Sequence, residues 1–475
     1  MSFVSVERWV GAVALGVTLG AGAAAVPAHG DTIESALVQA YQNNPSLNSQ
    51  RAAVRAVDEN VPQALSGYRP TVSITATGGE QSLSTTTKVP AILPGGSPTY
   101  ATLSGYNAPF TAGITATQTL FNGFQTANRT RQAESQVRAA RSALRTAEQT
   151  VLLNAVTAYM NLLRDTAILD LQRRNVEVLQ EQLRQTRDRF NVGEVTRTDV
   201  AQSESRLAAG RSQVLVAESN YKSSNATYIQ VIGTAPGKLA PGTSVDRFSP
   251  RTLPAAITVG SASTPAVVNA EFNVDVAQLQ VKIAEGALYP TLSVQGNLQK
   301  NFSQVGNVNT IEGYNASILG TLSIPIYQGG AEYSLVRQSK ETLGQRRLDL
   351  DVARDQARQT VVQSWGQLEA AKANIEATRA QVQAAEIALN GVREEARVGQ
   401  RTTLDVLNAQ QELVNARVAL VSAQRDRVVA SYTLLASVGR LSPQVIGLRV
   451  PVYNARVHYE QVRDSWAGLR TPDGR

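Results

Sequence analysis

The chain of 475 residues contains no cysteine and only two histidines. The missing thiols exclude disulfide bonds, thiolate metal sites and a lipid-modified cysteine behind a signal peptide. The sequence also lacks the Gly-x-Ser-x-Gly nucleophile motif and the His-Glu-x-x-His zinc motif. We therefore expect a protein that is not an enzyme, with no catalytic residue, no metal and no cofactor.

Aromatic residues are scarce, at 5% of the chain, although 43% of all residues are hydrophobic. This composition, which is rich in alanine, favours close packing of helices over a thick globular core. The formal charge of +7 comes mostly from arginines scattered along the expected helices. Because no basic cluster alternates with stacking aromatics, we expect a solvated helix surface and no nucleic-acid binding.

Long hydrophobic runs are also missing, except at the N-terminus. Residues 9–26 form an apolar, alanine-rich run that follows Arg8 and leads into Val-Pro-Ala, which ends at Ala28. This pattern predicts a secretory signal peptide over residues 1–28, removed after Ala28. A retained membrane anchor is the alternative, although the run is short for a span. An exported chain without cysteine is compatible with the periplasm or outer membrane of a Gram-negative cell.

One short motif occurs twice and organises the rest of the chain. Each copy has Val-Gly, then threonine three positions after the glycine, then Asp-Val three positions later. Gly193 and Gly399 can each end a helix, because glycine adopts the left-handed conformation without steric cost. A threonine or aspartate just beyond can cap the next helix. The two copies therefore predict helical hairpin tips over residues 190–199 and 396–405.

Apolar residues recur at every seventh position on both sides of each tip. The series before and after the first tip are Leu162, Leu169, Val176, Leu183 and Phe190, then Val200, Leu207, Val214, Tyr221 and Tyr228. The second half repeats the pattern, and a strict seven-residue repeat is typical of helices that supercoil around partners. Each helix that leads to a tip has about 65 to 70 residues, or roughly 100 Å. Because the returning helices are about half as long, we expect one long helix to pack against two short ones placed end to end.

Strand-like alternation of small polar and apolar residues occurs in two places. We predict strand hairpins over residues 71–120, with a loop of about 30 residues rich in Ser, Thr, Gly and Pro, and over residues 291–327, with a shorter loop. Four strands cannot close on themselves, and open edges are costly in lipid, so several chains must share a barrel if the strands lie in a membrane. Two chains would give a filled interior and three would leave a lumen. Water-soluble hairpins are the alternative.

The predicted domain boundaries follow from the duplication. They are a signal peptide over 1–28, a first repeat over 29–232, a linker over 233–264, a second repeat over 265–439 and a C-terminal tail over 440–475 with a short helix around 459–466.

These motifs together resemble the TolC family of outer-membrane efflux proteins. The resemblance rests on the tandem Val-Gly-x-x-Thr-x-x-Asp-Val tips, Leu-Phe-Asn-Gly at 120–123, Asn-Asn-Pro at 43–45 and Tyr-x-Pro or Tyr-Pro before each strand pair. It covers residues 31–440. The tail resembles that of family members from type I secretion systems.

The resemblance implies a mainly α-helical fold with a transmembrane β part. It implies a homotrimer in which four strands per chain contribute to a shared 12-stranded β-barrel in outer-membrane lipid, and long coiled-coil hairpins form a periplasmic tube. It further implies an exit duct for efflux or type I secretion that docks a periplasmic adaptor and an inner-membrane RND or ABC transporter at the tips. The tip residues assigned to docking are Val192, Gly193, Val195, Thr196, Val398, Gly399, Thr402 and Thr403.

The resemblance also assigns the periplasmic entrance. Two acidic rings of the family match Asp405 and position 408, which is Asn408 here, so one ring is missing and cation block or cation selectivity would be weaker than usual. The closing contact of the family matches Arg401 with Thr198 and Asp199, although its aromatic partner is replaced by alanine. The alternative is that the two aspartates only cap their helices.

Two function classes without a pore remain open. A periplasmic adaptor also has a helical hairpin, but usually one, flanked by compact β domains that the sequence does not indicate. A coiled-coil scaffold would lack the strand alternation.

Overall fold

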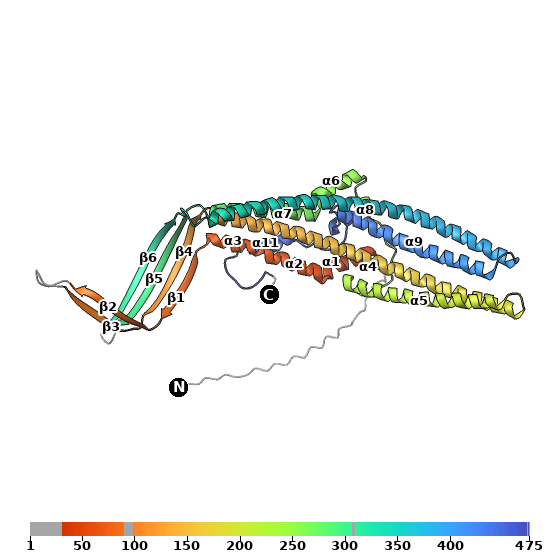
Figure 1. The fold of residues 1–475 in the computed structure, drawn as a ribbon, viewed down its shortest axis with the longest axis horizontal. Helices are drawn as coiled ribbons and strands as arrows, with labels where there is room; N and C mark the ends of the chain where they lie inside the picture. The colour runs from red at the N-terminus through yellow and green to blue at the C-terminus, as the bar shows by residue number, and fades with distance from the viewer. Residues whose placement is uncertain (1–30, 90–97, 306–308, 473, 475) are drawn as a thin grey trace, which may run out of the picture.

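The computed structural model describes residues 31–89, 98–305, 309–472 and 474. The predicted signal peptide and its cleavage site lie outside these residues. The molecule is elongated, with a β-sheet at one end and two long helical hairpins whose tips lie at the other end (Figure 1). No helix among the described residues combines the length and the apolar character that crossing a membrane requires.

Two helices of 67 residues each form the long axis, and shorter helices pack along them. The helices are α1 (Ile33–Asn43), α2 (Pro45–Asp58), α3 (Asn60–Leu65), α4 (Gln125–Asn191), α5 (Arg197–Ile232), α6 (Leu253–Ser263), α7 (Pro265–Gly286), α8 (Ala331–Arg397), α9 (Thr403–Ser437), α10 (Pro443–Ile446) and α11 (Ala455–Val462). Helix α4 contacts α5 towards its tip and α1, α2 and α3 towards the sheet, while α8 contacts α9 and α7 in the same way. This is the packing expected from the helix lengths.

Within the part of the chain that the structure describes, the sheet has six strands rather than the four that the sequence pattern indicated. They are β1 (Thr71–Gly78), β2 (Gln81–Val89), β3 (Thr99–Asn107), β4 (Phe110–Asn122), β5 (Thr291–Val305) and β6 (Asn309–Ser323). Strands β1, β4, β5 and β6 pair in that order and antiparallel, which leaves β1 and β6 at the edges. The long loop predicted after β1 was wrong, because its Ser- and Thr-rich residues pair as a β2–β3 ribbon.

The four main strands have one apolar and one polar face. Ile74 lies opposite Ile114, which lies opposite Leu298 on the next strand. On the other face, the Thr115 hydroxyl donates to Oδ1 of Asn297 at 3.2 Å. The alternation predicted from the sequence therefore places a continuous apolar surface on one side, and the side chains of Ile74 and Leu298 are exposed in the isolated chain.

The hydrophobic core lies at the middle of the helical part, where both repeats meet. It contains the fully buried rings of Tyr159 and Tyr228, whose centroids are 6.4 Å apart. The Tyr159 hydroxyl lies 2.6 Å from the carbonyl oxygens of Asp31 and Ala240, and burial raises its pKa to about 12. These contacts hold the predicted linker against the long helix. Part of this linker, residues 253–263, is helical as α6.

The C-terminal tail is not a loose appendage. Its helix α11 begins four residues earlier than the predicted helix around 459–466, because Asn454 caps it by accepting a hydrogen bond from the Arg456 backbone N–H. It packs on α2, and the Arg51 guanidinium is stacked between the rings of Tyr41 and Tyr453 at 4.6 and 5.3 Å from their centroids. The tail thus binds the first repeat and runs back towards the sheet end (Figure 1).

Candidate functional site

The two hairpin tips have the same backbone geometry. Helix α4 ends before Gly193 and α8 ends before Gly399, and both glycines have positive φ, at 84° and 78°. A Cβ at either position would meet nothing within 4 Å. Glycine is therefore required by the left-handed turn and not by crowding. Val192 and Val398, one residue earlier, are each 71% exposed.

The returning helices begin with reciprocal capping boxes. Thr196 Oγ1 accepts from the Asp199 N–H at 3.3 Å, while Asp199 Oδ2 accepts from the Thr196 N–H at 2.9 Å. Thr402 and Asp405 repeat this arrangement at 3.2 and 3.0 Å. The pKa of Asp405 is lowered mainly by the hydrogen bond from the Thr402 backbone N–H, and also by the hydrogen bond from the Thr402 hydroxyl. Each tip threonine and each tip aspartate thus satisfies the first turn of its helix.

A groove of about 950 Å³ lies between the two tips and brings together two of the five predicted entrance residues, while Thr198, Asp405 and Asn408 do not line it. Asp199 and Arg401 both line it, from different hairpins. They do not pair with each other in this chain, because Nε of Arg401 donates to Oε2 of Glu395 at 2.8 Å within its own hairpin. The groove is lined by Arg189, Glu194, Arg393 and Arg397 as well, so charges of both signs face it.

A hydrogen bond that sequence reasoning missed joins the two hairpins near this groove. Nη2 of Arg206 on α5 donates to Oδ1 of Asn408 on α9 at 2.7 Å. The amide oxygen of Asn408 is therefore a neutral acceptor for a guanidinium. Arg206 follows Asp199 by seven residues and so lies on the same face of α5, but only the spatial neighbourhood of α5 and α9 reveals its partner.

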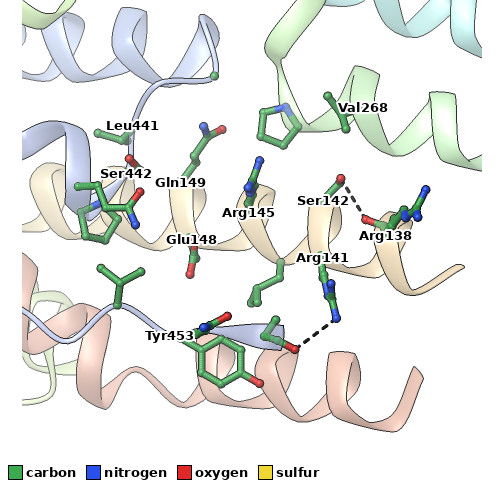
Figure 2. A pocket seen from close by; sticks show the side chains of 18 of the residues that line it. Arg138, Arg141, Ser142, Arg145, Glu148, Gln149, Val268, Leu441, Ser442 and Tyr453 are labelled. Atoms are coloured by element: carbon green, nitrogen blue, oxygen red, sulfur yellow. Dashed lines mark hydrogen bonds between the residues drawn. The ribbon is translucent and has the colours of Figure 1, made fainter. Parts of the chain in front are cut away.

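A second cavity, of about 670 Å³, lies where the tail meets α4 and the start of α7. Figure 2 shows Arg138, Arg141 and Arg145 on the same stretch of α4 around it. Arg141 donates to the Ala455 carbonyl at 3.4 Å, and Glu148 accepts from the Tyr41 hydroxyl at 2.9 Å. The residues around this cavity hold the tail against α4, and none of the predicted site residues lines it. Among the described residues, no group of three or more metal-ligating side chains is present.

Comparison with known proteins agrees with this geometry. The profile of the outer membrane efflux protein family matches residues 36–234 and 261–440. The outer membrane efflux protein BepC of Brucella suis is 43% identical over 469 residues, which cover 99% of this chain and 98% of BepC. The outer membrane protein TolC of Escherichia coli is 27% identical over 312 residues, 63% of each chain.

The fold is also that of solved structures. A crystal structure of CusC has a TM-score of 0.72 at 16% identity, covering 86% of this chain and 92% of that one. At this identity the likeness concerns the fold alone. The family profile and the similarity to BepC nevertheless span nearly all of both repeats. The chain therefore belongs to the outer membrane efflux protein family, the TolC family that its tandem tip motifs indicated.

Proposed function

We propose that this outer-membrane protein forms the exit duct of a tripartite efflux or type I secretion system. The main support for the proposal is that one chain combines two features. These are an open sheet with an apolar face and a helical rod roughly 100 Å long. The sheet suits a lipid bilayer and the rod suits the periplasm. Substrates would pass from an inner-membrane pump through the rod to the outside.

The working unit is a homotrimer with a shared barrel. Strands β1 and β6 each have one edge that pairs with no other described strand of the chain. Unpaired backbone groups cost several kcal/mol each in hydrocarbon. Three copies joined edge to edge would give twelve strands with a lumen, whereas two would leave space only for side chains. The polar face, which carries Thr115 and Asn297, would line the lumen.

The tips are the docking and gating end. Val192 and Val398 offer exposed apolar side chains at matching positions, which suit an adaptor that recognises both repeats alike. An RND or ABC transporter would lie beyond the adaptor. Asp405 and Asn408 would face the entrance together with Thr198, while Arg401 and Asp199 line the groove that separates the hairpins.

The proposal is tested on the full chain purified from outer membranes in detergent. We expect a trimer by light scattering and stepwise conductance in planar bilayers. A stable monomer that forms no pores would overturn the proposal. A soluble periplasmic pool without a membrane-bound trimer would instead favour a periplasmic adaptor or a scaffold. Recovery of an adaptor protein by crosslinking at residue 192 would identify the docking partner.

A further inference from the structure

Residues 463–472, which follow helix α11, carry a set of exposed side chains near the start of strand β1. Helix α11 ends at Val462, which is buried, and every residue from 463 to 472 is exposed. Arg69 holds this segment in place: its Nη1 donates to the Ser465 carbonyl at 2.6 Å, and its guanidinium lies 4.5 Å from the centroid of the Trp466 ring. The Trp466 side chain is nonetheless 72% exposed, and Leu469 is fully exposed.

The strand register fixes the level of Arg69 along the sheet. Thr71, the first residue of β1, pairs with Thr117, which in turn pairs with Gln295 on β5. Arg69 precedes Thr71 by two residues. It therefore lies at the helix-side end of the sheet, close to the level of the first residues of β5.

The apolar band of the sheet begins at this same level. Its first complete row on β5 and β6 is Leu292 opposite Leu322. Its other end is marked by the ion pair between Lys300 and Glu312, at 3.3 Å. The nine residues from Leu292 to Lys300 span roughly 26 Å along the strand at about 3.3 Å per residue. At the tilt of about 40° that barrel strands have, this corresponds to a height of about 20 Å, close to the outward apolar band of about 25 Å in outer-membrane barrels.

Aromatic side chains cluster at the helix-side boundary of the band. Tyr68, Tyr289 and Tyr327 flank the strand ends there and are 53%, 53% and 75% exposed. Tryptophan and tyrosine are enriched at the level of lipid headgroups, where the ring is apolar and its polar atom stays wet. Arg69 and Arg470 add positive charge, which suits anionic headgroups.

We infer that residues 463–472 form a lipid-contacting surface at the periplasmic leaflet of the outer membrane, with Trp466 and Leu469 in the headgroup region. The inference rests on the proposed function, because the sheet must lie in the bilayer. It adds to that function a second membrane contact, made by a tail that the family profile, which ends at residue 440, does not include.

Tryptophan fluorescence tests the inference, because the chain has only Trp9, Trp365 and Trp466. The full chain with Trp9→Phe and Trp365→Phe, reconstituted in phosphatidylethanolamine and phosphatidylglycerol vesicles, reports on Trp466 alone. The matched control with Trp9→Phe and Trp466→Phe reports on Trp365, which packs against the core at the middle of the helices. We expect phospholipids brominated on the acyl chains to quench Trp466 roughly threefold more than Trp365, because an interfacial ring touches the upper acyl chain.

Aqueous iodide provides the opposing measurement. Strong iodide quenching of Trp466 without quenching by brominated lipid would place the ring in water, and protection from both quenchers would place it against protein; either result overturns the inference. Conductance of the same vesicles distinguishes a failure of the tail contact from a failure of the proposed channel function. If the vesicles conduct but brominated lipid does not quench Trp466, only the tail contact is contradicted. If the chain fails to insert or to conduct, the proposed function is contradicted.

Discussion

The carboxylate of Asp58 on α2 lies 3.1 Å from Nδ1 of His458 on α11, a residue 400 positions away in sequence. The Asp58 side chain is completely buried, and Nη2 of Arg141 on α4 lies 3.8 Å from its other oxygen. One buried carboxylate therefore joins the tail to two helices of the first repeat. Burial raises the pKa of Asp58, while the hydrogen bond from His458 and the charge of Arg141 act in the opposite direction.

Removing this carboxylate should release the tail. Asp58→Ala leaves His458 and Arg141 without their buried partner, which costs about 3 kcal/mol or more when one member of a buried pair is lost. We expect amide hydrogen exchange in α11 to accelerate by about 100-fold. The control is Asp464→Ala, because the Asp464 side chain is 81% exposed and its ion pair with Arg463 contributes little. Unchanged protection of α11 in Asp58→Ala would show that packing alone holds the tail.

The same residue should give the tail contact a pH dependence. The pKa of folded Asp58 is raised above its ordinary value of 3.8. The protonated carboxyl therefore stabilises the folded state below about pH 3.8, and this stabilisation is lost as the pH rises through the raised pKa. Asp58→Asn keeps an acceptor for His458 but cannot ionise. We expect the stability of α11 in wild type, relative to Asp58→Asn at the same pH, to fall as pH rises from about 4. A difference that grows with pH would mean that attraction to Arg141 and His458 outweighs burial.

The Arg206 to Asn408 hydrogen bond should hold the hairpins together at the entrance. Arg206→Ala removes a contact worth about 1 kcal/mol in each chain, so single-channel conductance in planar bilayers should rise. Asn408→Asp should lower it, because a carboxylate attracts Arg206 more strongly. Arg211→Ala, which removes the same charge from the same helix, is the control. If only Arg401→Ser raises conductance, the entrance is held by the contact that the family resemblance implies.

Two glycines with positive φ should respond differently to alanine. At Gly123, between β4 and α4, a Cβ would collide with the Gly286 carbonyl and lie 2.9 Å from the Cβ of Tyr289. At Gly193 it would meet nothing, so only the left-handed strain of about 1 kcal/mol remains. We expect Gly123→Ala to reduce the yield of folded protein in the outer membrane strongly and Gly193→Ala to reduce it little. Equal yields would show that the joint between sheet and helix can shift.

The helices and tips could be predicted because their determinants are local in sequence. The seven-residue repeat and the absence of proline and glycine predicted a helix from about 125 to 190, against Gln125–Asn191 in the structure. The capping threonines and left-handed glycines predicted both tips within a few residues. The four main strands followed from their alternation.

Features that depend on pairing across the chain were not predictable. Strand β2 contains mostly serine and threonine with both faces exposed, so no hydrophobic period marks it, and its register comes from backbone pairing with β3. The tail contact requires Asp58 and His458 to meet across 400 residues. The same is true of Arg206 and Asn408, whose meeting depends on how two separate hairpins pack.

The open edges of the sheet have a consequence for biogenesis. A lone chain that entered the bilayer would expose the unpaired N–H and C=O groups of β1 and β6 to hydrocarbon. In the proposed trimer, newly exported copies would have to meet before or while they insert. The rate of membrane integration would then rise more steeply than in proportion to the amount of protein made, so that weak expression leaves chains waiting in the periplasm, exposed to proteases.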